Sequence, residues 1–134
     1  MKQVGVDTRR RRAIVEGGAL VYDADKATLA HGLVTTFGVV SHTGVGGLTL
    51  GGGFGRLNRK HGLTIDNLMS ATVVTADGRV MTASAEQNPD LFWSLRGGGG
   101  NFGVATDFEF ALHPLPARML GGNVVWPASK AKEV

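Results

Sequence analysis

Two glycine clusters are the part of the sequence best suited to chemistry. A glycine has no Cβ, so its backbone N–H groups can come close to a flat or anionic ligand. The chain has 21 glycines among 134 residues, against an average share of about 7 per cent. The glycines could instead form tight turns and β-bulges without any ligand. Runs of three and four glycines favour close packing of the backbone against a ligand or another part of the protein. The clusters comprise Gly44, Gly46, Gly47, Gly51, Gly52, Gly53 and Gly55, and Gly97, Gly98, Gly99, Gly100 and Gly103.

Standard phosphate-binding fingerprints do not explain these clusters. No glycine is followed by Lys and then Ser or Thr, so the P-loop motif is absent from the sequence. Gly98, Gly100 and Gly103 match the pattern G-x-G-x-x-G. That fingerprint needs a strand before it and a helix after it, whereas here a predicted helix comes first and a predicted strand follows. The sequence therefore does not support a nicotinamide-dinucleotide site.

Other candidate catalytic groups are sparse. The four histidines show no metal-ligand spacing, and only His42 adjoins a glycine cluster, where contact with a ligand stays an open alternative. The sequence has neither a G-x-S-x-G elbow nor an obvious carboxylate pair. It has no cysteine, which excludes disulfides, Cys-ligated zinc and iron–sulfur clusters. We therefore assign no catalytic residue and no metal site.

The charge of the chain is modest and unevenly distributed. The formal net charge is +3, and Arg9–Arg12 form a continuous basic run. Such a run is compatible with a nucleic-acid patch, but the absence of interleaved aromatic residues favours a solvated turn between two strands. No apolar run approaches the roughly 18 residues that span a bilayer, and the start of the chain lacks a secretory signal pattern. We expect a cytoplasmic protein without nucleic-acid or membrane partners.

Periodicity and turn residues predict an α+β domain in one piece. Asp23 is the expected N-cap of a helix that stops at Gly32. Asp77-Gly78 predicts a hairpin with a two-residue turn of positive φ, and Pro89 marks the start of another helix. The expected strands are Val4–Asp7, Ala13–Glu16, Leu33–Phe37, Ala71–Ala76, Arg79–Ala83, Val104–Phe110 and Met119–Trp126, and the expected helices are Asp23–His31, Phe54–His61 and the one that begins near Pro89.

Several separate motifs, taken in order, carry a family resemblance. They are TGVGGLTLGGGFGRLNRKHGLTIDN at Thr43–Asn67, VVTADGR at Val73–Arg79, NPDLFW at Asn88–Trp93, RGGGGNFGV at Arg96–Val104 and the following His113-Pro114. Together they resemble the flavin-binding domain of the vanillyl-alcohol oxidase superfamily. Within it, the chain is most similar to the berberine-bridge-enzyme and hydroxynicotine-oxidase type of FAD-linked oxidases, over about Gly5–Trp126.

The resemblance implies that FAD binds in an extended form between two α+β subdomains. The fold would be a PCMH-type subdomain, with a mixed or antiparallel sheet and short flanking helices. Ser41–Gly47 would line the pyrophosphate or isoalloxazine, Gly51–Gly55 would let the next helix approach the cofactor, and Gly103-Val104 would meet the adenosine end. Asp66 and Asn67 would hold the loop structure. The cofactor-binding residues implied in this way are Ser41, His42, Thr43, Gly44, Val45, Gly46, Gly47, Thr49, Gly52, Gly55, Gly103 and Val104.

The resemblance also implies a domain division and a function. Residues 1–115 would be the C-terminal part of the FAD-binding domain, and residues 116–134 would be the truncated start of a substrate domain. The family's histidine that bonds covalently to flavin would lie before this chain. Val40 stands where doubly linked members carry a cysteine. The parent would be an FAD-dependent oxidase of a small alcohol, amine or sugar-like substrate.

Two alternatives concern the 134-residue chain itself. The first is a non-catalytic folded remnant that forms a homo-oligomer through an exposed half of the flavin cradle. The second is a basic nucleic-acid-binding module that uses Arg9–Arg12.

Overall fold

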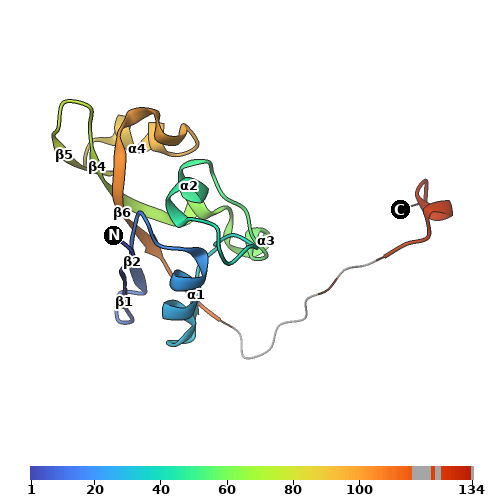
Figure 1. Cartoon of the computed structure of the whole chain (residues 1–134). Helices are drawn as coiled ribbons and strands as arrows, with labels where there is room; N and C mark the ends of the chain where they lie inside the picture. The colour runs from blue at the N-terminus through green and yellow to red at the C-terminus, as the bar shows by residue number, and fades with distance from the viewer. Residues whose placement is uncertain (116–121, 123–124, 134) are drawn as a thin grey trace.

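A five-stranded antiparallel sheet forms the body of the molecule (Figure 1). The computed structural model describes residues 1–115, 122 and 125–133. The strand order is β1-β2-β6-β4-β5, and a separate two-stranded sheet joins β3 to β7. The strands are β1 (Val4–Asp7), β2 (Arg12–Glu16), β3 (Leu33–Val34), β4 (Leu68–Val74), β5 (Val80–Ser84), β6 (Val104–Ala111) and β7 (His113–Pro114).

The arginine run forms the turn between β1 and β2, as the sequence predicts. Asp7 pairs with Arg12 in the ladder, and Arg11 takes a positive φ of 53° in the turn. Arg10 lies 3.9 Å from the Asp7 carboxylate, and Arg12 forms a 3.1 Å ion pair with Glu109. Two of the four arginines thus have carboxylate partners within the chain.

A β-bulge in β6 changes the alternation expected for that strand. In the sequence, Val104, Thr106, Phe108 and Phe110 alternate with Ala105, Asp107, Glu109 and Ala111, which predicts a half-buried strand. Phe108 and Phe110 are fully buried, but Val104 is 64% exposed. Thr72 pairs with Asp107 and Val73 pairs with Ala105, so Thr106 is an extra residue on β6. The extra residue transfers the side chains before it to the opposite face of the sheet. Val104 therefore lies outside the core.

The β4–β5 hairpin turns at Asp77-Gly78, as predicted, but residues 76–78 connect the hydrogen-bonded Thr75 and Arg79, so the turn has three residues where two were expected. Gly78 N–H donates to Thr75 O at 2.9 Å, and Thr75 N–H donates to Arg79 O at 2.9 Å. Gly78 has φ +78°, and a β-carbon there would meet nothing within 4 Å. The glycine is required for its backbone conformation alone.

Gly78→Ala should destabilise the chain by about 1–2 kcal/mol, the cost of a left-handed conformation in a residue with a Cβ. Urea denaturation followed by circular dichroism measures this loss. Gly5→Ala is the control, because Gly5 lies in β1 with open space around a β-carbon and without a positive φ. A Gly78 variant as stable as the Gly5 variant would contradict the explanation.

Within the described residues, four short α-helices pack against the sheet, and three of them were expected. Their bounds are α1 (Val21–Leu29), α2 (Val45–Leu50), α3 (Asn58–His61) and α4 (Pro89–Leu95). The described part of the chain also has the 3-10 turns η1 (Thr64–Asn67), η2 (Gly99–Phe102) and η3 (Ala128–Lys130). Helix α4 begins at Pro89 as predicted, whereas α3 is shorter than the expected Phe54–His61. The expected strand Leu33–Phe37 is reduced to Leu33–Val34, and Met119–Trp126 falls mostly outside the described residues.

The cap of α1 corrects one prediction. The N-cap is Leu20, and Asp23 stands three residues later, where its Oδ2 accepts the Leu20 N–H at 3.0 Å. A carboxylate in the first turn still accepts a hydrogen bond from a free N–H group and interacts favourably with the positive end of the helix dipole. Gly32 follows the helix with φ +65°, as the sequence predicts.

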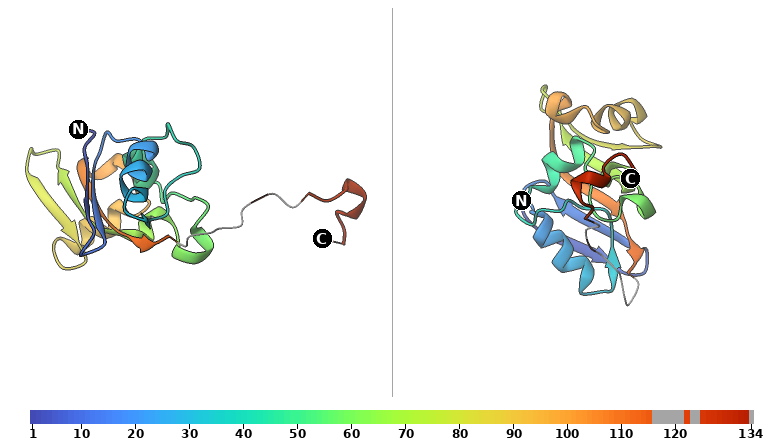
Figure 2. Two further views of the ribbon diagram at one scale, coloured as in Figure 1. Left: turned by 90° about the horizontal axis from the view of Figure 1, so that it is seen from below. Right: turned by 90° about the vertical axis from the view of Figure 1, so that its right-hand side faces the viewer.

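The hydrophobic core lies between the sheet and the helices on one of its faces (Figures 1 and 2). Phe37 packs edge-on against Phe110 with ring centroids 5.2 Å apart. Ile14, on the opposite face of β2, is exposed. No helix in the described part of the chain is long and apolar enough to cross a membrane.

Candidate functional site

The segment 41–45 runs alongside the start of α1 and is fixed there by its backbone. Tyr22 N–H donates to Ser41 O, Val21 N–H donates to Thr43 O, and Val45 N–H donates to Ala19 O, each at 2.9 Å. These bonds hold the chain without using the side chains of Ser41 and His42, which are exposed. The structure thus presents this part of the predicted site on the surface.

Helix α2, which carries the next predicted residues, turns several of them inward. Val45 and Thr49 are fully buried, and the Thr49 hydroxyl donates to Val45 O at 2.7 Å. A β-carbon at Gly46 would lie 2.8 Å from Gly17 O and 3.6 Å from the Phe108 ring. Gly46 is therefore explained by close packing of α2 on the sheet, and the side chains of Val45 and Thr49 support the helix.

Gly44 and Gly47 differ from Gly46, because nothing in the chain requires them to be glycine. Both are exposed, and a β-carbon at either would meet no atom within 4 Å. Gly44 has φ −70° and ψ 130°, which any residue adopts. The backbone is bare at these two positions and open to the outside.

Apolar side chains extend the same open segment. Val39 and Val40 are 52% and 42% exposed, and Phe54, beyond α2, is 66% exposed. Exposed apolar groups next to bare backbone form a surface suited to a planar aromatic ring, because such a ring buries apolar area and needs close approach.

The glycines after α2 mainly serve packing within the chain. A β-carbon at Gly55 would overlap the carbonyl oxygen of Phe37. Gly55 N–H donates to Asn58 Oδ1 at 2.7 Å, at the start of α3. Gly52 has φ +103° with open space around a β-carbon, so its backbone conformation explains it. These residues shape the loop that leads from α2 to α3.

The second glycine cluster lies against the first, because η2 packs against α2. Gly103 has φ +140°, and a β-carbon there would lie 2.5 Å from Val74 O. Gly103 is thus required by the β4–β6 ladder, while the neighbouring Val104 is exposed. The fold thus brings the two glycine clusters, which are separate in the sequence, into contact with each other.

Asn67 holds the loop after α3, as expected. Its Nδ2 donates to His61 O at 2.9 Å and to Leu63 O at 2.8 Å. The side-chain oxygen therefore faces His113 Nε2 at 2.7 Å, and that nitrogen must carry the proton. The rings of His61 and His113 stack with centroids 3.9 Å apart and an interplanar angle of 6°. The two histidines form a contact between α3 and β7.

Protonation of this histidine pair is disfavoured in the folded chain. Burial lowers the pKa of His61, and the nearby His113 and Lys60 lower it further. Burial also lowers the pKa of His113, with a smaller effect from Lys60. Both rings are therefore neutral over more of the pH range than in the unfolded chain.

The chain should lose stability as the pH falls below about 6.5, the ordinary pKa of histidine. Because folding lowers both pKa values, the unfolded chain binds more protons in this range, and the stability present above it decreases. His113→Gln keeps an N–H donor for Asn67 but cannot be protonated. We expect it to flatten the decrease in Tm between about pH 7.5 and 5.5, measured by circular dichroism.

The Asp25 carboxyl has the opposite effect on stability as the pH falls, because burial raises its pKa to about 6. Its contribution is common to the wild type and the variant, so the comparison isolates the histidines. His31→Gln, on the exposed residue after α1, is the matched control and should leave the slope unchanged. Equal flattening by both substitutions would contradict the role of the stacked pair.

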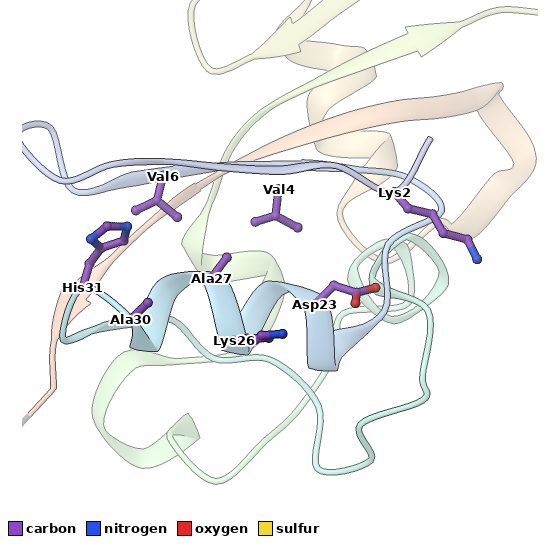
Figure 3. A pocket seen from close by; sticks show the side chains of 8 residues that line it. All are labelled: Lys2, Val4, Val6, Asp23, Lys26, Ala27, Ala30 and His31. Atoms are coloured by element: carbon purple, nitrogen blue, oxygen red, sulfur yellow. The ribbon is translucent and has the colours of Figure 1, made fainter.

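A cavity of about 510 Å³ lies apart from the glycine segments, between β1 and α1 (Figure 3). Val4 and Val6 line one side, and Ala27 and Ala30 line the other. None of the predicted cofactor-binding residues borders it. Among the described residues, no group of three or more histidine or acidic side chains could hold a metal ion.

Comparison with known proteins identifies the family. Residues 1–84 match the family model of the FAD binding domain. The chain is 49% identical over 113 residues to the FAD-linked oxidoreductase pgmH of Aspergillus terreus, which covers 84% of this chain and 23% of that protein. It is 42% identical over 129 residues to (R)-6-hydroxynicotine oxidase of Paenarthrobacter nicotinovorans, which covers 96% of this chain and 28% of that protein.

Solved structures agree with these relatives. The crystal structure of 6-hydroxy-D-nicotine oxidase from Arthrobacter nicotinovorans matches with a TM-score of 0.87 and 42% identity, over 90% of this chain and 27% of that one. Glucooligosaccharide oxidase from Acremonium strictum matches with a TM-score of 0.83 and 42% identity, over 87% of this chain and 25% of that one. The chain spans less than a third of the length of these curated relatives.

These matches confirm the predicted α+β fold of the PCMH type and the resemblance to FAD-linked oxidases. The chain therefore belongs to the FAD-binding domain family of the FAD-linked oxidoreductases, and FAD is its cofactor.

Proposed function

We propose that this chain supplies one wall of the FAD site of an oxidase. The observation that carries the proposal is the pair Gly44 and Gly47, which are exposed, open and unexplained by packing within the chain. Val39 and Val40 continue the surface with exposed apolar groups. A bare backbone beside apolar side chains fits a flavin ring, which is flat, apolar on its faces and polar at one edge.

The residues divide into two roles in this proposal. Ser41, His42, Thr43, Gly44 and Gly47 contact FAD through exposed backbone and hydroxyl groups, and Val104 contacts it from the second cluster. Val45, Gly46, Thr49, Gly52, Gly55 and Gly103 hold that surface in shape. We propose no direct side-chain contact for Val45 and Thr49, because both are buried.

The parent activity we propose is oxidation of a small alcohol, amine or sugar-like substrate. FAD supplies the redox chemistry by taking a hydride from the substrate and passing the electrons to oxygen. The residues of this chain bind and orient the cofactor. The same proposal divides the chain at residue 115, with the FAD-binding part before it and the start of a substrate domain at 116–134. A cytoplasmic location remains part of the proposal, based on the absence of cysteine.

Titration of FAD with the 134-residue chain tests the proposal. We expect saturable quenching of flavin fluorescence, with weaker quenching by riboflavin, which lacks the pyrophosphate and adenosine. Linear quenching without saturation would contradict it. Identical titrations of FAD with heat-denatured chain give the background.

Self-association is the second candidate, and exposed apolar residues favour it. Trp93 and Val80 are 78% and 70% exposed, and Val104 is exposed beside β4. Apolar side chains of this size on a surface favour contact with another copy. Light scattering of the purified chain should show a dimer or larger species, whereas a monomer at all concentrations would remove this candidate.

A further inference from the structure

Strand β1 is an edge of the five-stranded sheet, and in the described part of the chain no hydrogen bond joins its outer side to another segment. Glu16 N–H donates to Gln3 O at 3.0 Å, so Gln3 and Glu16 form a hydrogen-bonded pair that continues the β1–β2 ladder. Bonded and non-bonded pairs alternate in an antiparallel ladder. The N–H and C=O groups of Val4 and Val6 therefore point away from β2. An edge with such unpaired groups can accept another strand.

The cavity of about 510 Å³ between β1 and α1, which we call the β1–α1 groove, lies beside this edge (Figure 3). Val4 and Val6 line it from β1, and their side chains point toward α1, where Ala27 and Ala30 line the other side. Val4, Val6 and Ala27 are only half-buried, so this apolar floor is accessible. Side chains alternate between the two faces of a strand. A strand added to β1 would therefore place every second side chain over the groove.

The rim of the β1–α1 groove is basic. Lys2 lines it near the start of β1, and Lys26 lines it from α1. Both lysines are exposed, and neither forms an ion pair within the described residues. Asp23 also lines the groove, but its Oδ2 already accepts the Leu20 N–H at 3.0 Å. The rim thus has two ammonium groups against one carboxylate, and its charge is complementary to an acidic ligand.

An open strand edge beside an apolar groove is the arrangement by which proteins bind an extended peptide as an added strand. We propose that the β1–α1 groove binds an extended segment of another protein with an acidic end, as a sixth strand antiparallel to β1. The backbone of the segment exchanges hydrogen bonds with Val4 and Val6, alternate apolar side chains cover the floor, and a carboxylate lies between Lys2 and Lys26. None of the residues proposed to contact FAD lines this groove. The two sites are therefore separate.

A second copy of this chain is the rival occupant, because its own β1 has the same open edge. Pairing of two β1 strands would place both basic rims on the same face of the joined sheet, where like charges repel. We therefore expect light scattering to give the same mass for the wild type and for Val6→Pro, which lacks one of the outward N–H donors. A dimer that becomes a monomer on this substitution would show that β1 binds a second copy, and it would overturn the proposal.

Titration of the isotope-labelled 134-residue chain with the acetylated and amidated peptide Thr-Val-Thr-Val-Thr-Glu, without flavin, tests the proposal. We expect saturable shifts of the Val4 and Val6 amide proton resonances to lower field, because these N–H groups gain an acceptor. The affinity should fall as salt is added, since the lysines are exposed.

Two further peptides are the matched probes. In the first, lysine replaces the glutamate, which reverses the charge at the basic rim. In the second, both valines are N-methylated, because their N–H groups would face β1 in the added strand. Neither peptide should give saturable shifts. Shifts that do not saturate with the acidic peptide, or that the acidic and basic peptides produce equally, would overturn the proposal.

A proline substitution tests the strand edge. Val6→Pro removes an outward N–H without removing a bond of the β1–β2 ladder, and proline is tolerated at such edge positions. We expect it to abolish the saturable shifts at Val4. Val80→Pro is the matched control, because the Thr75–Arg79 hydrogen bond likewise leaves the Val80 N–H on the outer side of β5, the opposite edge of the sheet. It should bind the peptide like the wild type.

A charge reversal tests the rim separately. Lys26→Glu should weaken the affinity at least severalfold, whereas Arg59→Glu, the same reversal on an exposed residue of α3, should leave it unchanged. Far-ultraviolet circular dichroism shows that each variant is folded. Unchanged affinity in Lys26→Glu, or in a folded Val6→Pro, would overturn the proposal. Because these titrations contain no FAD, such a result would leave the proposed flavin site unaffected.

Discussion

Gly55→Ala should destabilise the chain more than any other single substitution considered for it. The added β-carbon would overlap the carbonyl oxygen of Phe37 and lie 3.0 Å from its carbonyl carbon. Both obstructing atoms belong to the backbone, so a side-chain rotation cannot remove the clash. Phe37 is itself buried against Phe110, and the loop cannot move without disturbing the core. We expect a loss of about 3 kcal/mol or more, a large part of the stability of a domain of this size.

Urea denaturation followed by circular dichroism measures this effect. Gly47→Ala is the matched control, because it adds the same methyl group to a glycine eight positions earlier with no atom within 4 Å. Alanine should even stabilise α2 at that position by up to about 1 kcal/mol. If the Gly55 variant were as stable as the Gly47 variant, the loop would have to relax more freely than the packing around Phe37 indicates.

Local features of this fold were predictable because a few neighbouring residues determine them. Gly78 with a positive φ forms the hairpin turn, Pro89 begins α4, and Gly32 and Gly62 follow their helices with positive φ. Each depends on backbone preferences that the residue carries into any context. The sequence therefore indicated these turns and helix ends correctly.

Helix α2 could not be predicted, since local propensity opposes it. Two of its six residues are glycine, the poorest helix former after proline. Its stability comes from contacts with distant residues, where Gly46 fits against Gly17 and Phe108. The bulge at Thr106 also depends on pairing with β4, which lies more than 30 residues earlier. Long-range packing decided both features, and a single sequence does not display it.

The candidate site shows the same division between local and long-range information. The sequence correctly marked the segment around Gly44 as exceptional, but it could not separate glycines that pack within the chain from those that face outward. Gly46 and Gly47 are adjacent and identical in type, yet a β-carbon would strike Gly17 at one and empty space at the other. The contact between η2 and α2, which brings the second cluster to the first, also required the fold.

Gly47→Val should separate cofactor binding from folding. Valine is at least as favourable as glycine within a helix, and a β-carbon at this position would meet no atom within 4 Å. If FAD lies against α2 as we propose, the new side chain occupies space that the cofactor needs. Forcing such groups into a filled contact costs about 1–3 kcal/mol, which weakens FAD binding by about tenfold to a hundredfold. Fluorescence titration measures the affinity, and thermal denaturation shows that the fold is retained.

Gly5→Val is the matched control, because Gly5 is also exposed with open space around a β-carbon but lies in β1, away from α2. It should bind FAD like the wild type. Equal affinity in the Gly47 and Gly5 variants would mean that FAD does not approach α2, and the openness of Gly47 would then need another ligand. A loss of affinity at Gly47 alone would connect this open glycine, which packing within the chain does not explain, to the cofactor of the family. Gly55→Ala and Gly47→Ala should therefore have opposite effects on stability. This difference separates a glycine required by packing within the chain from a glycine that we assign to ligand binding.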